Sequence, residues 1–295
     1  MTSFLFIPMP GNEALAHSLA QALGGEIGQV DLREFPDGET YLRFADDISG
    51  RKIAIACTLD HPNSKILPLL FAAATARELG ADTIGLVAPY LAYMRQDRRF
   101  KTGEAVTSQQ IAQLLSHAFN WLVTVDPHLH RYSSLSEIYH IPTQVVHAAP
   151  LISEWIKENV VNPLIIGPDS ESEQWVSAVA KDAEAPYTVL QKVRRGDRDV
   201  EITINDTELT HERTLVLVDD IISSGRTMLE AVRLIKERKR APPICIAVHG
   251  LFADNCDQLL ARAGARVVTC NTVPHSTNAI DVQRSLAETI KFGRY

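Results

Sequence analysis

The sequence predicts an α/β fold of two tandem domains, each with a mainly parallel sheet flanked by helices. Short apolar, β-branched runs alternate along the chain with longer amphipathic stretches, which is the pattern of strands joined by helices in a parallel sheet. The block 51–90 can be laid over the block 212–250, and both follow the order strand, polar loop, helix, strand. The overlay continues from 114–128 to 259–275. We therefore expect two copies of one fold, with chance similarity between α/β units as the alternative.

The expected elements follow in chain order. The first residues indicate a strand and a turn, because Pro8 and Pro10 interrupt the apolar run and no basic stretch precedes it. Further strands are expected at 53–57, 83–90, 121–126, 163–169, 214–220, 243–250 and 265–270. Helices are expected at 69–80, 108–118, 173–182 and 227–239. Thr107 and Gln110 suggest a capping box for the second helix.

The domain boundary is expected between the two repeated blocks. We predict a first domain at 1–146 and a second at 147–295, with Pro142 and Pro150 flanking the boundary. The last residues of the chain are candidates to pack back on the first domain. Between its repeated blocks the first domain carries extra, basic sequence at 95–110.

The composition excludes several classes of protein. Apolar residues make up 45% of the chain and charged residues 22%, the balance of a soluble globular protein. The formal net charge of −7 argues against a nucleic-acid-binding protein. No apolar run reaches the roughly 18 residues that a membrane helix needs, so we expect no membrane partner. The four cysteines form no C-x-x-C pair, which favours reduced thiols in a cytoplasmic protein.

The strongest chemical signal is the stretch 214–232, TLVLVDDIISSGRTMLEAV. An apolar strand ends in Asp219 and Asp220, and a short polar loop then opens a helix. Free N–H groups at the start of a helix favour an anion, and a glycine lets the backbone approach a phosphate closely. The two acids suit sugar hydroxyls instead. A surface turn with an N-cap is the alternative, but it leaves two acids at the end of a buried strand unexplained.

This stretch resembles the PRPP-binding signature shared by type I phosphoribosyltransferases and PRPP synthetases. The resemblance implies that both domains have the type I phosphoribosyltransferase-like fold and that Asp219 and Asp220 bind ribose hydroxyls. It implies that the 5-phosphate is bound by the loop residues Ser223, Ser224, Gly225, Arg226 and Thr227. The corresponding loop of the first half, 58–65, lacks the acid pair and the glycine. We expect no ribose phosphate there.

The first half resembles PRPP synthetases at several separate places. Segment 35–39, FPDGE, is similar to the family's adenine-contacting turn, and 89–115 is similar to its Y-x-R-Q-D-R stretch with the following basic loop. VTVDPH at 123–128 and GPD at 167–169 match two further motifs. The resemblance implies these ATP-binding residues: Phe35, Asp37, Glu39, Arg95, Gln96 and Asp97. Without it, the first segment is only a good turn and the arginines are a solvated basic face.

The same resemblance makes His128 and Asp169 groups linked to Mg²⁺. Both follow expected strands, at the carboxyl edge where open α/β sheets bind ligands. Histidine is an unusual direct ligand for Mg²⁺, which prefers oxygen, and His130 is close enough in sequence to be confused with His128.

The charged segment 187–204 is expected to be a mobile lid. The resemblance matches Lys192 and Arg194 to the family's K-x-R pair and implies that they stabilise charge on the transferred group in the transition state. Lid closure would also exclude water. A solvated hairpin is the alternative.

The implied reaction is attack by the C1 hydroxyl of ribose 5-phosphate on the β-phosphorus of ATP, with Mg²⁺ as cofactor, giving PRPP and AMP for nucleotide biosynthesis. The implied partners are ATP and ribose 5-phosphate, and we expect a homo-oligomer, a dimer or higher. No general base is identified, although Asp220 is a candidate. Two departures from the family are the bulky, acidic segment 170–175 and the loop residues Ser223 and Arg226. The alternatives are a non-catalytic regulatory relative and a phosphoribosyltransferase that consumes PRPP.

Overall fold

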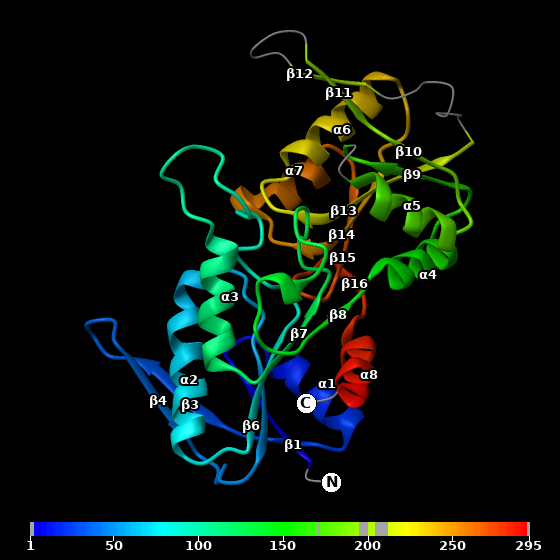
Figure 1. Cartoon of the computed structure of the whole chain (residues 1–295). Helices are drawn as coiled ribbons and strands as arrows, with labels where there is room; N and C mark the ends of the chain where they lie inside the picture. Colours follow the sequence, from blue (N-terminus) through cyan, green and yellow to red (C-terminus); the bar gives the residue numbers. More distant parts are fainter. Residues whose placement is uncertain (1–2, 170–171, 195–199, 204–211, 294–295) are drawn as a thin grey trace. The chain divides into compact units, whose positions relative to one another are not determined.

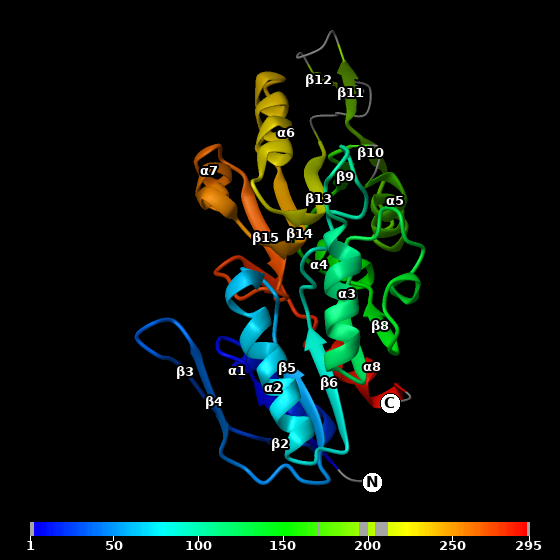
Figure 2. The same cartoon turned by 60° about the vertical axis from the view of Figure 1, so that its left-hand side comes forward.

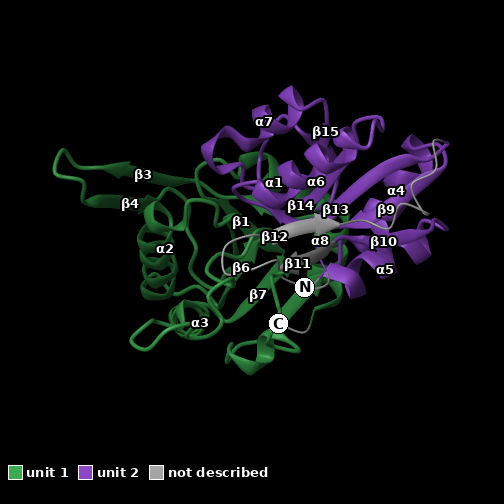
Figure 3. Cartoon of the chain, turned by 90° about the horizontal axis from the view of Figure 1, so that it is seen from above, with its two compact units in different colours: residues 1–146, 283–295 green, residues 147–282 purple. Residues whose placement is uncertain are grey.

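The structure is a computed structural model that describes residues 3–169, 172–194, 200–203 and 212–293. The side chains of 191–194 and 200–203 lie outside this description. The chain divides into two compact units (Figure 3). The first comprises Met1–Val146 with Gln283–Tyr295, and the second comprises His147–Val282.

The first unit is built on a parallel sheet with strand order β2-β1-β5-β6-β7-β8. Its strands are β1 (Phe4–Pro8), β2 (Glu26–Ile27), β5 (Lys52–Ala56), β6 (Thr83–Ala88), β7 (Trp121–Val125) and β8 (Thr143–Val146). Its helices are α1 (Glu13–Leu23), α2 (Ile66–Glu78), α3 (Thr107–Ala118) and α8 (Gln283–Phe292). Helices α2 and α3 cover one face of the sheet, and α1 and α8 cover the other (Figures 1 and 2). Because both faces are covered, strands such as β7 are buried along their whole length.

A two-stranded antiparallel ribbon of β3 (Val30–Glu34) and β4 (Thr40–Phe44) extends from the first unit (Figure 1). The sequence pattern did not predict these strands. Their side chains alternate between a partly buried apolar row, which includes Leu32 and Leu42, and an exposed row that includes Arg33. The turn of the ribbon is the FPDGE segment, so the ribbon positions the predicted adenine-contacting residues.

The second unit repeats the plan of the first. Its parallel sheet has the order β10-β9-β13-β14-β15-β16. As in the first unit, the second strand of the unit lies at the edge of the sheet, beside the first strand. The strands are β9 (Pro163–Gly167), β10 (Tyr187–Val189), β13 (Thr214–Ile222), β14 (Ile244–Gly250), β15 (Arg266–Cys270) and β16 (Asn278–Ile280). The helices are α4 (Ala149–Asn159), α5 (Glu173–Asp182), α6 (Arg226–Glu237) and α7 (Cys256–Arg262). The predicted fold class, two tandem α/β domains with parallel sheets, is confirmed.

The smaller elements complete the description. An antiparallel pair, β11 (Gln191–Arg194) and β12 (Val200–Thr203), belongs to the second unit. Short 3₁₀ turns occupy Pro62–Ser64, Leu135–Glu137 and Ala253–Asn255. Among the described residues, no helix is both long and apolar enough to span a membrane.

The expected capping box at Thr107 is wrong. Helix α3 begins at Thr107 itself, and the residue before it, Val106, makes no side-chain capping bond. The Thr107 hydroxyl donates instead to Oε1 of Gln96 at 3.1 Å. The Thr107 hydroxyl, which the local pattern assigned to capping the helix, is therefore bonded to Gln96 outside the helix.

Candidate functional site

Two adjacent carboxylates stand near the end of β13 in the second unit. The N–H of Asp220 donates to Oδ1 of Asp219 at 3.0 Å, and both residues are partly buried. Burial raises the pKa of Asp219 well above its usual value, and repulsion from Asp220 and Asp169 adds to this rise. The effect of Asp169 on this pKa links the end of β9 to the end of β13, two strands that pair in parallel. Three acids thus gather at one edge of the second sheet.

The polar loop after β13 leads directly into α6. Gly225 precedes the helix with a φ of 65°, a left-handed conformation that favours glycine. The loop N–H groups from Ser224 to Met228 donate to no acceptor in the described part of the chain. At the start of a helix such groups, together with the helix dipole, favour an anion. Ser223 and Ser224 lie in this loop, Arg226 and Thr227 lie in the first turn of α6, and their binding of ribose 5-phosphate stays a prediction.

The loop after β14 supports the loop after β13. The carbonyl of Ser223 accepts the N–H of Ala253 at 3.0 Å and the thiol of Cys256 at 3.1 Å. A Cβ added at Gly225 would come within 2.9 Å of the Cβ and Sγ of Cys256. Burial, with the charges of Asp257 and Asp254, raises the pKa of Cys256 to about 11, so the thiol keeps its proton as a donor. Sequence reasoning missed Cys256, because its relation to the loop is purely tertiary.

Asp169 follows β9, where Gly167 is buried. Its main-chain carbonyl accepts the hydroxyl of Ser172 at 2.7 Å and the N–H of Ser172 at 3.3 Å. This turn opens α5 at Glu173, so part of the divergent segment 170–175 forms the start of a helix. Ser170 and Glu171 lie outside the described residues.

The predicted catalytic pair lies on β11. Lys192 pairs in register with Ile202 of β12, and Arg194 pairs with Val200. The structure describes the backbone of this pair of strands, while both side chains, and Arg195 and Arg198, lie outside the described part. The catalytic role of Lys192 and Arg194 stays a prediction.

The ribbon turn of the first unit presents an aromatic and two acids. The N–H of Phe35 donates to the carbonyl of Glu39 at 2.7 Å, and the N–H of Glu39 donates to Oδ1 of Asp37 at 3.2 Å. Phe35 is 41% exposed, and its ring meets Tyr41 edge-on at 6.1 Å. The guanidinium of Arg33 lies 4.1 Å from the centre of the Tyr41 ring and 5.2 Å from that of Phe35. A planar ligand has an exposed ring to stack on here.

The basic loop between β6 and α3 divides its residues between solvent and structure. Arg95 is exposed and has no polar partner in the described part of the chain, whereas Gln96 accepts the Thr107 hydroxyl. The side chain of Asp97 is only 6% exposed, and its carboxylate lies 3.4 Å from Nε of Arg131. The ATP contact of Asp97 stays a prediction, but its carboxylate is already used to hold Arg131.

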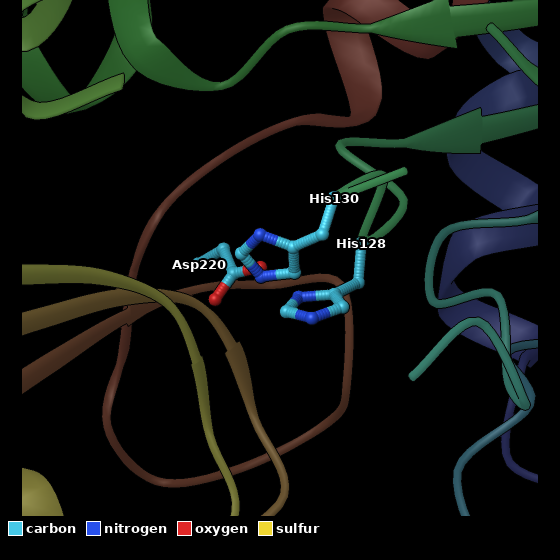
Figure 4. Close-up of side chains that lie close together, drawn as sticks. All are labelled: His128, His130 and Asp220. Atoms are coloured by element: carbon cyan, nitrogen blue, oxygen red, sulfur yellow. The ribbon is translucent and has the colours of Figure 1, made fainter. Parts of the chain in front are cut away.

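Two histidines lie on the loop after β7 (Figure 4). The ring centres of His128 and His130 are 3.9 Å apart, and the ring planes make an angle of 74°. Asp126, just after the strand, has a φ of 29°, an outlier for a residue with a side chain. Asp220, also labelled in Figure 4, belongs to the second unit. The sequence singled out His128 and gave His130 no role.

The repeated parallel sheet, and the acid pair and glycine loop of the second unit, define an α/β protein of the phosphoribosyltransferase-fold class. Residues 134–287 match the family model of the phosphoribosyl transferase domain. Residues 5–118 match the family model of the N-terminal domain of ribose phosphate pyrophosphokinase. The chain is 33% identical to a ribose-phosphate pyrophosphokinase of Saccharolobus solfataricus, with 92% of this chain and 94% of the relative covered. The chain belongs to the ribose-phosphate pyrophosphokinase family.

Two further comparisons agree. A ribose-phosphate pyrophosphokinase of Methanopyrus kandleri is 30% identical, with 94% of this chain and 95% of the relative covered. The crystal structure of phosphoribosylpyrophosphate synthetase from Mycobacterium smegmatis has a TM-score of 0.86 and 24% identity, with 98% of each chain covered, and supports the fold. The predicted family and the prediction of an enzyme are confirmed. The alternatives of a regulatory relative and a phosphoribosyltransferase are not favoured.

Proposed function

We propose that this chain transfers the pyrophosphoryl group of ATP to the C1 hydroxyl of ribose 5-phosphate, giving PRPP and AMP. The observation that carries the proposal is the end of β13. Asp219 and Asp220 stand directly before a loop whose N–H groups are unused and whose Gly225 allows close approach. Acceptors for sugar hydroxyls and donors for a phosphate therefore follow each other along a few residues, which fits a phosphorylated ribose.

The two domains take one substrate each in this proposal. Residues 1–146 bind ATP, through Phe35, Asp37 and Glu39 of the ribbon turn and through Arg95, Gln96 and Asp97 of the basic loop. Residues 147–295 bind ribose 5-phosphate, with α8 packed on the first unit. The exposed ring of Phe35 and the exposed guanidinium of Arg95 support the assignment, since adenine stacks on aromatic rings and arginine suits phosphates.

A divalent cation fits the acidic edge of the second sheet. Burial, together with repulsion from Asp220 and Asp169, raises the pKa of Asp219, and a bound cation would relieve that repulsion. Carboxylate oxygens are the ligands that Mg²⁺ prefers. We propose that His128 and Asp169 are linked to Mg²⁺, each within its own unit, and bound Mg²⁺ would neutralise phosphate charge. Asp219 and Asp220 then orient the sugar, and the loop N–H groups hold its 5-phosphate.

Lys192 and Arg194 supply positive charge to the transferred group. Phosphoryl transfer needs positioning and electrostatic stabilisation more than covalent chemistry by the protein. Lys192 and Arg194 occupy alternate positions of β11, and two positive charges from one strand would act together on the transferred group.

The active form in this proposal is a homo-oligomer. Helices α2 and α3 lie side by side (Figures 1 and 2) and expose Leu67, Phe71 and Leu114 at 53%, 42% and 48%. Exposed apolar side chains grouped on neighbouring helices are typical of a protein interface. Light scattering after size-exclusion chromatography measures the assembly, and a monomer at working concentration would contradict it.

The deciding experiment measures AMP formation from ATP and Mg²⁺ with and without ribose 5-phosphate. We expect sugar-dependent AMP, and we expect Lys192→Ala to lower its rate roughly 100- to 1,000-fold, as the loss of a transition-state charge donor does. Lys181→Ala, at an exposed lysine of α5, is the matched control and should leave the rate unchanged. AMP formation that ignores the sugar, or none under varied metal and phosphate conditions, would sink the proposal.

A further inference from the structure

We propose that His128 and His130 chelate one divalent cation, so that this chain binds borderline cations such as Co²⁺ and Ni²⁺ more tightly than Mg²⁺. The inference rests on the proposed function for the place of the metal in the reaction. Of the two histidines, only His128 was assigned to the metal there. His130 becomes a second nitrogen ligand.

The geometry of the pair suits a shared ion. The two side chains come from alternate positions of one loop, and their rings meet edge-on with 3.9 Å between their centres (Figure 4). Their ring nitrogens lie within 4.8 Å of one another. Two imidazoles that bind one ion hold it at about 2.1 Å each, so chelation would bring their nitrogens to within about 4.2 Å of each other. The rings are inclined at 74°, so lone pairs from both can point to a common position.

The surroundings do not oppose a cation. The nearest positive residue in sequence is Arg131, and its guanidinium lies 3.4 Å from the carboxylate of Asp97, which balances its charge. His130 is exposed and His128 is half-buried, so an ion reaches the pair from solvent. The unusual φ of Asp126 turns the chain immediately before the pair. Backbone outliers of this kind persist where a functional group must be held in place.

The ligand chemistry sets the class of cation. Imidazole nitrogen binds Mn²⁺, Co²⁺, Ni²⁺ and Zn²⁺, with affinity that rises along the series to Cu²⁺, whereas Mg²⁺ prefers oxygen and keeps its waters. One histidine beside oxygen ligands is compatible with Mg²⁺. A second imidazole adds nothing for Mg²⁺ but chelates a borderline cation. The two histidines therefore separate the two classes of metal by affinity.

The test titrates the full chain with Co²⁺ and, separately, with Mg²⁺ by calorimetry, without ATP or sugar. We expect Co²⁺ to bind more tightly. We expect His130→Asn to weaken Co²⁺ at least about tenfold, the lower end of what disturbing a metal site costs, and to leave Mg²⁺ nearly unchanged. His140→Asn, at an exposed histidine of the same unit, should change neither affinity. Visible absorption of bound Co²⁺ reports whether nitrogen ligands are lost.

The substitution His130→Asp gives an independent arm. A carboxylate replaces the nitrogen with a hard oxygen, so we expect the preference to move toward Mg²⁺. Circular dichroism checks that each variant is folded, and a misfolded His130→Asn leaves the decision to His130→Asp. Equal Co²⁺ affinity in wild type and both variants, or tighter Mg²⁺ in the wild type, overturns the inference. Because no turnover is measured, the result is independent of whether sugar-dependent AMP formation is found.

Discussion

The loops after β5 and β13 occupy the same place in the two sheets but use their polar groups differently. In the overlay of 51–90 on 212–250, Thr58 and Leu59 of the first loop stand opposite Asp219 and Asp220, which lie in β13 just before the second loop. Lys65 stands opposite Arg226, where each loop meets its helix. The two loops therefore occupy equivalent positions in the two sheets.

The first loop has polar groups that are bonded to its own residues and to neighbours in the first unit. The ammonium of Lys65 pairs with Oδ1 of Asp60 and also donates to the carbonyl of Thr58 at 3.0 Å. The N–H of Thr58 donates to the side chain of Asn12 at 2.8 Å, and the hydroxyl of Tyr93 donates to Asn63. Its one lysine is thus neutralised by its own aspartate. With this lysine neutralised, the loop offers a phosphate less positive charge than the loop after β13, where Arg226 is exposed.

The second loop is supported through its carbonyl groups, which leaves its N–H groups available. Its carbonyls at Ile222 and Ser223 accept N–H groups of Leu251, Phe252 and Ala253, while its own N–H groups after Ser223 have no acceptor in the described residues. The two loops thus differ in how their charged groups are paired, and only the second combines an acid pair with a glycine and an exposed arginine.

The largest expected effect follows from closing the space at Gly225. An alanine there meets Cys256 at 2.9 Å and must also take a positive φ, so Gly225→Ala displaces the loop. We expect kcat/KM for ribose 5-phosphate to fall roughly 100-fold, as it does when a binding group is misplaced by about an ångström. Steady-state kinetics with ribose 5-phosphate as the varied substrate measure this.

Gly24→Ala is the matched control, because Gly24 has a φ of 63° but nothing within 4 Å of an added Cβ. It carries the conformational strain, about 1 kcal/mol of stability, without the collision. Equal kinetic losses in the two variants would show that the phosphate loop is not where ribose 5-phosphate binds.

A smaller effect is expected from the hydrogen bond that supports the loop. Cys256→Ala removes the thiol that donates to Ser223, whereas Cys256→Ser keeps a donor. A lost hydrogen bond of about 1 kcal/mol corresponds to roughly a fivefold rise in KM for ribose 5-phosphate, and the serine should restore most of it. Cys245→Ala, at a cysteine buried in β14, should lower the melting temperature without changing this KM. A KM that serine fails to rescue would assign Cys256 to packing alone.

The sequence predicted those parts of the fold that local pattern controls. The continuous apolar run Leu215–Val218 marks a strand covered on both faces, and the order of the two acids and the glycine that follow indicates the chemistry of the site. The strand nevertheless runs two residues further, because Ile221 and Ile222 pair with His249 and Gly250 of β14. That extension depends on a neighbouring strand, which no local window contains.

Other features depend on residues far apart in the chain and escaped prediction. Asp97 is held by Arg131, and Ser223 is supported by Cys256; neither pair has a sequence signature. The β3–β4 ribbon escaped prediction because apolar and charged residues alternate along it, whereas the predicted strands are continuous apolar runs. The sites could be predicted as residue types at strand ends, whereas the groups that position them required the tertiary structure.

The smallest kinetic effect is expected in the first loop, where the comparison can be sharpened by opening the internal pair. Asp60→Asn leaves the ammonium of Lys65 without its carboxylate, in a position where its side chain is only 24% exposed. We expect a loss of about 1 to 3 kcal/mol in the free energy of unfolding, since a charged hydrogen bond is broken. The KM for ribose 5-phosphate should change by no more than about twofold, as for independent sites. Denaturant unfolding and steady-state kinetics on one preparation measure both. If KM rises tenfold while stability holds, the first loop also binds the sugar phosphate, and the division of work between the two loops is wrong.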